Sequence, residues 1–108
     1  MTRPEDRRLE SRRPDNARAL VLAPGVEMTC VIADRSASGM RLRLDRNLSL
    51  PNAVQVVDIA TGVAIEAEVV WRRHQEAGIK QRGQHSLRGL VPSRLTTAKA
   101  AWTRAGGR

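Results

Sequence analysis

The chain has 108 residues, the size of one ordinary domain with room for a single modest hydrophobic core. Nineteen Lys and Arg against eleven Asp and Glu give a formal net charge of +8, which indicates an anionic partner. A single cysteine excludes an intramolecular disulfide and a cysteine-based metal cluster. The charged start from Met1 to Arg13 and the lack of a membrane-length apolar run predict a cytoplasmic protein with no membrane contact.

Residues 1–17 are rich in arginine and poor in apolar side chains. Apart from Met1, Leu9 is their only large apolar residue, among Arg3, Arg7, Arg8, Arg12 and Arg13. Such a segment buries too little apolar surface to order itself. We therefore predict a flexible Arg-rich N-terminal arm over residues 1–17.

From Arg18 onward, strand-sized apolar stretches alternate with turn residues. The stretches are Ala19 to Leu22, Met28 to Ala33, Met40 to Leu44, Val54 to Val57, Val63 to Trp71 and a weak Ala77 to Ile79. The turn signals between them are Pro24-Gly25, Asp34 to Gly39, Leu50-Pro51-Asn52 and Thr61-Gly62. This pattern predicts an all-β fold over residues 18–90, built as a small closed or nearly closed antiparallel barrel.

Period-two alternation indicates which side chains face the core. It is clearest at Met40, Leu42 and Leu44, with Arg41 and Arg43 facing water. A second series, Ile65, Ala67, Val69 and Trp71, alternates with Glu66, Glu68 and Arg72. We accordingly expect Trp71 in the core, and place it beneath a ligand's base only as the alternative.

Residues 91–108 form a C-terminal segment in which Ser93 to Ala105 is predicted to be a short helix. Leu95, Ala98 and Trp102 lie along one side, and Gly106-Gly107 ends the helix. We expect this apolar side to cover an opening of the barrel. A partner-binding helix is the alternative.

Two short motifs carry candidate chemistry. The first is Arg8-x-x-x-Arg12 with Arg7 in front, a pattern that also occurs at Arg3/Arg7 and Arg104/Arg108 in this arginine-rich chain. The second is Asp34-x-Ser36-x-x-Gly39, which lies between two expected strands and is far rarer by chance. A purely structural interpretation makes it a hairpin turn in which Asp34 bonds backbone amides and Gly39 supplies a positive φ or a bulge.

Taken together, the two motifs resemble the PilZ domain family. The resemblance includes Val69-Val70-Trp71 and Ala77-Gly78-Ile79 and extends from Arg7 to Lys80, although Ile79-Lys80-Gln81 lacks an aromatic that the family often has there. It implies a six-stranded antiparallel β-barrel with a short C-terminal helix. It also implies a non-enzymatic receptor for cyclic di-GMP, with the ligand bound by Arg7, Arg8, Arg12, Asp34, Ser36 and Gly39.

The chemistry of these residue types fits that ligand. An arginine fork matches the O6 and N7 acceptors of guanine, or a phosphate, and can stack on a purine. Asp34 is suited to accept from guanine N1 and N2, Ser36 to donate to a phosphate, and Gly39 to let backbone approach closely. The arm would close over the ligand and so change the surface shown to a protein partner. In proteins that this chain resembles, an Arg directly before the Arg-x-x-x-Arg element goes with a stacked, two-molecule form of the ligand, so the resemblance implies the same for Arg7. We expect no cofactor and no metal.

Two other binding functions stay open at this stage. One is a basic β-barrel that binds nucleic acid, although such barrels use aromatic platforms and this chain has only two tryptophans. The other is a PilZ-like protein-interaction module without a ligand. Catalysis is not expected, because His74, His85 and Cys30 have no partners at catalytic or metal-ligand spacing.

Overall fold

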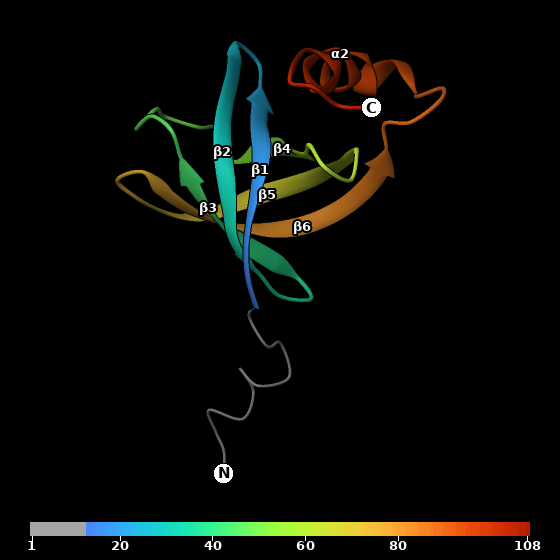
Figure 1. The fold of residues 1–108 in the computed structure, drawn as a ribbon. Coiled ribbons are helices and arrows are strands. Elements are labelled where there is room, and N and C mark those ends of the chain that lie inside the picture. Colours follow the sequence, from blue (N-terminus) through green and yellow to red (C-terminus); the bar gives the residue numbers. More distant parts are fainter. Residues whose placement is uncertain (1–12) are drawn as a thin grey trace.

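The structure, a computed structural model, describes residues 13–108. It contains the strands β1 (Arg13–Ala23), β2 (Val26–Arg35), β3 (Gly39–Leu44), β4 (Ala53–Asp58), β5 (Val63–Arg73) and β6 (Glu76–Ser86). A 3-10 turn η1 (Ser93–Leu95) leads into the helix α2 (Thr96–Arg104) (Figure 1). The prediction of a mostly antiparallel β fold with one short C-terminal helix is confirmed.

The strands pair in the order β1-β2-β3-β6-β5-β4, and β4 pairs back with β1, so the sheet is closed. Each of the predicted apolar stretches lies within a strand. The weakest of them, Ala77 to Ile79, is part of a strand of 11 residues. The sequence underestimates β6 because its second half is polar, yet that half still pairs with β5 as far as Ser86.

The core consists of two clusters. The first fills the inside of the closed sheet with aliphatic side chains such as Ile32, Leu42 and Val56. The second lies on the outside, where α2 packs against Leu20 and Val57. Both strands β1 and β4 therefore bury side chains on their two faces near α2.

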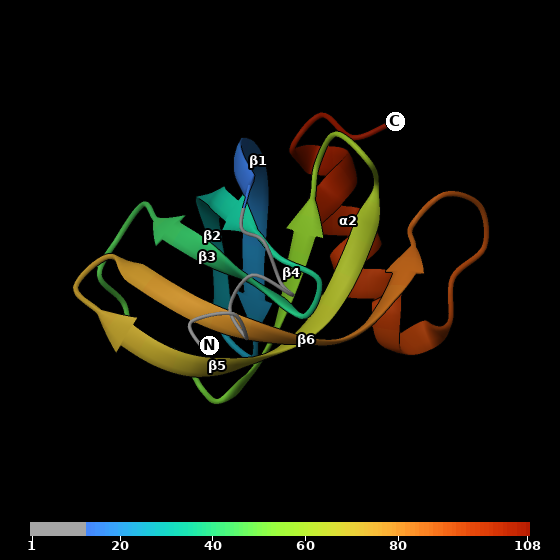
Figure 2. The same ribbon diagram turned by 90° about the horizontal axis from the view of Figure 1, so that it is seen from below.

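The helix agrees with the prediction in sequence position and differs in what it covers. Its buried residues are Ala98, Ala101 and Trp102, with Leu95 just before it. The expectation that this side covers a barrel opening is wrong, because α2 lies along the outer flank of β1 and β4 (Figure 2). Leu20, Leu22 and Val57 point outward there and provide the apolar surface that the helix covers.

Strand β1 begins at Arg13, before the apolar stretch that marks it in the sequence. Residues 13–17 are thus part of a strand rather than of the predicted arm, because backbone pairing with β2 needs no apolar side chains. Among residues 13–108, no helix has the length and apolar character to cross a membrane.

Candidate functional site

Three of the expected site residues, Asp34, Ser36 and Gly39, lie together where β2 turns into β3. The other three, Arg7, Arg8 and Arg12, lie outside the described residues. The described part of β1 begins directly beside the motif, because Arg13 pairs with Arg35 and Pro14 pairs with Asp34. The chain that precedes Arg13 therefore enters the sheet at the motif.

Residues 34–39, which we call the motif hairpin, are held by backbone bonds. The Ser36 amide donates to the Gly39 carbonyl at 2.9 Å, and the Gln81 amide of β6 donates to the Ser38 carbonyl at 2.8 Å. Gly39 does not have a positive φ. A Cβ at Gly39 would lie 2.3 Å from the Ile79 carbonyl oxygen, so glycine is needed here to let β3 approach β6.

A β-bulge in β2 decides which way the motif side chains point. The register passes from Ile32 opposite Leu42 to Asp34 opposite Arg41, so that Ala33 is the extra residue. Without this bulge, alternation from Cys30 and Ile32 would point Asp34 inward. With it, Asp34 lies beside the outward Arg41, and the next residue, Arg35, reaches the inside of the closed sheet.

A second bulge, in β5, has the same effect on Trp71. Val69 pairs with Ile79 and Trp71 pairs with Gly78, so Val70 is the extra residue. The expected core position of Trp71 is wrong: the residue is 41% exposed, because the bulge shifts the alternation that buries Ala67. The indole lies on Gly78, where a Cβ would be 1.9 Å from its Nε1.

The two bulges place four residues side by side on the outer face, and we call them the outer row: Asp34, Arg41, Gly78 and Trp71. Arg41 Nε donates to Asp34 Oδ2 at 2.8 Å, and its NH1 donates to Glu76 Oε2 at 2.7 Å. The bond to Asp34 is the main cause that raises the pKa of Arg41 above its ordinary value. Arg41 thereby orients the Asp34 carboxylate, while Trp71 offers an exposed aromatic face in the same row.

A hollow of about 520 Å³ lies next to the outer row, at the neighbouring paired positions of β3, β6 and β5. It is lined by Val31, Arg43, Leu44, Asp45, Arg73, His74, Gln75 and Glu76. Arg43 and Arg73 are exposed on this face. The sequence shows Arg41 and Arg43 on the wet side of β3, but only the pairing of distant strands reveals that they adjoin Trp71 and Arg73.

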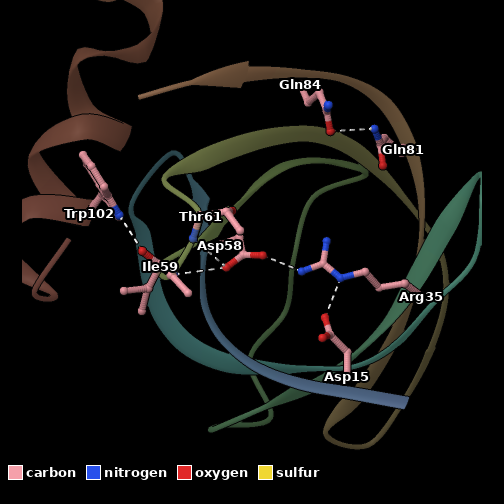
Figure 3. A network of polar contacts seen from close by, with 9 residues as sticks. Asp15, Arg35, Asp58, Ile59, Thr61, Gln81, Gln84 and Trp102 are labelled. Carbon is pink, nitrogen blue, oxygen red and sulfur yellow. Dashed lines mark hydrogen bonds and ion pairs between the residues drawn. The ribbon is translucent and has the colours of Figure 1, made fainter. Parts of the chain in front are cut away.

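Arg35 belongs to a separate polar cluster on the inside of the closed sheet (Figure 3). Its Nε donates to Asp15 Oδ2 and its NH2 donates to Asp58 Oδ2, each at 2.5 Å. We call these three residues the Arg35 bridge. Burial acts to lower the pKa of Arg35, but the bonds to Asp15 and Asp58 outweigh it and raise the pKa above the ordinary value. The bridge borders a cavity of about 490 Å³ that Arg13 and Gln84 also line.

Other chemistry finds little support in residues 13–108. They hold no group of three or more His, Cys, Asp or Glu that could bind a metal ion. A hollow of about 710 Å³ lies between the β1-β2 turn, β4 and α2, and none of its lining residues belongs to the motif hairpin. The motif hairpin and the outer row are therefore the candidate binding site.

A match to a known family covers most of the chain. The family model described as the PilZ domain matches residues 6–90, which include the motif hairpin, the outer row and the three arm arginines. The comparisons with curated proteins and with solved structures find no match.

Proposed function

Since the chain belongs to the PilZ domain family, a family of cyclic di-GMP receptors, we propose that it binds cyclic di-GMP between its N-terminal arm and the outer row. The arm arginines Arg7, Arg8 and Arg12 and the hairpin residues Asp34, Ser36 and Gly39 form the site. On this proposal the closed sheet is the six-stranded barrel of the family, and residues 91–108 form the C-terminal helical part. Closure of the arm is the conformational signal passed to a protein partner.

The observation that carries the proposal is the place where β1 starts. Arg13 lies opposite Arg35, one residue before Ser36, so the arm is attached at the edge of the motif hairpin. An extended chain spans at most about 3.3–3.6 Å per residue. The arm arginines, no more than six residues before Arg13, are thus within reach of a ligand lying on the outer row.

The chemistry of the described part of the site suits a guanine nucleotide. The Asp34 carboxylate, oriented by Arg41, can accept from guanine N1 and N2, and the exposed face of Trp71 can stack against a purine. Exposed arginines beside the row, Arg43 and Arg73, add positive potential for two phosphates. Gly78 matters indirectly, because only glycine leaves room for the indole.

Titration calorimetry with cyclic di-GMP tests the proposal. We expect a dissociation constant in the micromolar range or below for the wild type. Arg8→Ala or Arg12→Ala should weaken binding by about 1.5 to 3 kcal/mol, which is roughly tenfold to a hundredfold. Absence of binding by the wild type would refute the proposal, and the fitted stoichiometry distinguishes one bound ligand from two.

A matched control separates site contacts from a general loss of charge. Arg104 belongs to α2, which lies at the opposite end of the molecule from the β2-β3 turn (Figure 1). It forms an exposed ion pair with Glu27 at 2.6 Å. Arg104→Ala removes the same charge as Arg8→Ala without touching the proposed site. Its affinity for cyclic di-GMP should stay within about threefold of the wild type, because exposed charges at that separation are largely screened.

A further inference from the structure

Arg35 has no direct part in the proposed ligand contacts, although it lies within the motif. Its side chain points toward Asp15 and Asp58 and bonds to both of them (Figure 3). There it joins β1 through Asp15 and β4 through Asp58.

The first residues of β1 have few backbone bonds to hold them. The register shifts between Pro14 and Ala17, and Asn16 in this interval has a φ of 58°. Among the described residues that precede the irregularity, Arg13 and Pro14 are the two that pair with β2, and proline has no amide to donate. The segment to which the arm is attached therefore depends on side-chain contacts for its position.

The other end of the Arg35 bridge is firmly fixed. Asp58 is 3% exposed, and its Oδ1 accepts from the amides of Ala60 and Thr61 at 3.2 and 3.4 Å. Ile59 directly follows Asp58, and its carbonyl accepts from Trp102 Nε1 at 2.8 Å, so this corner is also joined to α2. Arg35 thus connects the weakly paired start of β1 to a buried corner of the sheet.

We propose that Arg35 is a positioning residue, which holds the start of β1 through Asp15 so that the arm arginines are placed over the motif hairpin. This inference rests on the proposed function. Without the bridge, the arm would still be attached and charged, but each binding event would have to order the start of β1 as well. The ligand should then bind more weakly even though every contacting residue is present.

Asp15→Asn gives a test in which the sign of the effect is decisive. Removing a negative charge near an anionic ligand should strengthen binding if electrostatics alone acts. If Asp15 positions the arm through Arg35, the same change should weaken cyclic di-GMP binding by about fivefold to tenfold. The fold should survive, because the Asp15 side chain is 30% exposed and Arg35 keeps Asp58 as its partner.

Three further variants complete the experiment. Glu27→Gln removes an equal charge from an exposed pair with Arg104, and its affinity should be unchanged or slightly higher. Asp15→Glu restores the carboxylate and should recover most of the affinity. Arg35→Lys keeps the charge but has no fork to bridge two carboxylates, and its effect should not add fully to that of Asp15→Asn.

A second measurement does not involve the ligand. Amide hydrogen exchange over residues 13–18 should become faster in Asp15→Asn than in Glu27→Gln, because only the former loosens the start of β1. Wild-type binding combined with equal or tighter binding by Asp15→Asn overturns the positioning role and leaves the proposed function intact. If the wild type does not bind cyclic di-GMP, the proposed function fails, and the inference fails with it.

Discussion

At the scale of single residues, Cys30 shows how burial changes a titration. The thiol lies inside the sheet at 3% exposure, and its pKa is raised from 9.0 to about 12, first by burial and then by the charge of Asp45. The folded chain therefore favours the neutral thiol more than the unfolded chain does. This preference stabilises the fold fully below the unfolded pKa, and the stabilisation is lost as the pH rises from about 9 toward 12.

We expect the free energy of unfolding to fall by about 2 kcal/mol through this thiol between about pH 8 and pH 10.5. Urea denaturation followed by circular dichroism at the two pH values measures the difference. Cys30→Val removes the titrating group and should remove that part of the decrease. An equal decrease in Cys30→Val would assign the effect to other groups.

The site residues show what sequence can predict at this scale. The motif predicted Asp34, Ser36 and Gly39 as ligand-binding residues from their types and spacing, and the structure places them in one hairpin. It did not identify Arg41, whose bond to Asp34 depends on the register between β2 and β3. It also did not reveal that Gly39 avoids a clash with Ile79 rather than providing a positive φ.

At the scale of secondary-structure elements, α2 is attached through one large side chain. Trp102 is 3% exposed and lies against Gly62 and Gly107, where a Cβ would be 2.7 and 2.2 Å from its ring atoms. Its Nε1 also donates to the Ile59 carbonyl. The glycines on both sides make the space that the indole fills.

The two tryptophans should differ sharply in their contribution to stability. Trp102→Ala should cost about 3 to 5 kcal/mol, the usual cost of emptying a buried aromatic site. Trp71→Ala should cost less than about 2 kcal/mol, because that side chain is 41% exposed. Urea denaturation of both variants measures the costs. A Trp71→Ala variant as unstable as Trp102→Ala would contradict the environments seen here.

Alternation and turn residues predicted the six strands and the helix because burial on one face leaves a periodic pattern. They failed at Trp71, where a single extra residue, Val70, reverses the faces of everything after it. They also failed for the side covered by α2, since β1 and β4 are apolar on both faces. A bulge has no signature in a pattern of apolar and polar residues, so such failures concentrate where the sheet is irregular.

At the scale of the whole molecule, the net charge of +8 raises the question of nucleic acid. Many of the described arginines are already paired with carboxylates, such as Arg82 with Glu68 and Arg94 with Glu66. Because the net charge already counts these carboxylates, the excess of +8 is carried by other basic side chains, including Arg43 and Arg73 beside the outer row. A small ligand with two phosphates needs only the local potential around the outer row.

Salt dependence should distinguish the two kinds of ligand. From about 50 mM to about 200 mM salt, cyclic di-GMP affinity should fall by less than about tenfold, because screening alone acts on a small anion. A nucleic acid gripped through 6–10 phosphates would lose roughly 10³–10⁵ over that range through counterion release. Parallel titrations with cyclic di-GMP and a DNA duplex provide the comparison. Tight DNA binding with the steep dependence would favour the nucleic-acid function.

The meeting of the start of β1 with the motif hairpin also belongs to this scale. Composition predicted an Arg-rich arm, and motif spacing predicted a turn, but only the register of β1 with β2 places one beside the other. Closure of the sheet through β1 and β4 likewise depends on pairs far apart in sequence. Such contacts are set by the packing of the whole sheet, which no local window of sequence contains.

The unequal exposure of the two tryptophans gives the protein a built-in optical readout. With neither Phe nor Tyr in the chain, all of its near-ultraviolet aromatic emission comes from these two indoles. Light at the red edge of the spectrum originates mainly from the water-exposed ring on Gly78, and light at the blue edge from the ring beneath the C-terminal helix. Quenching of the emission of Trp71 at the red edge would thus report ligand binding. A red shift of the emission of Trp102 would separately report release of the helix, and neither measurement needs a label.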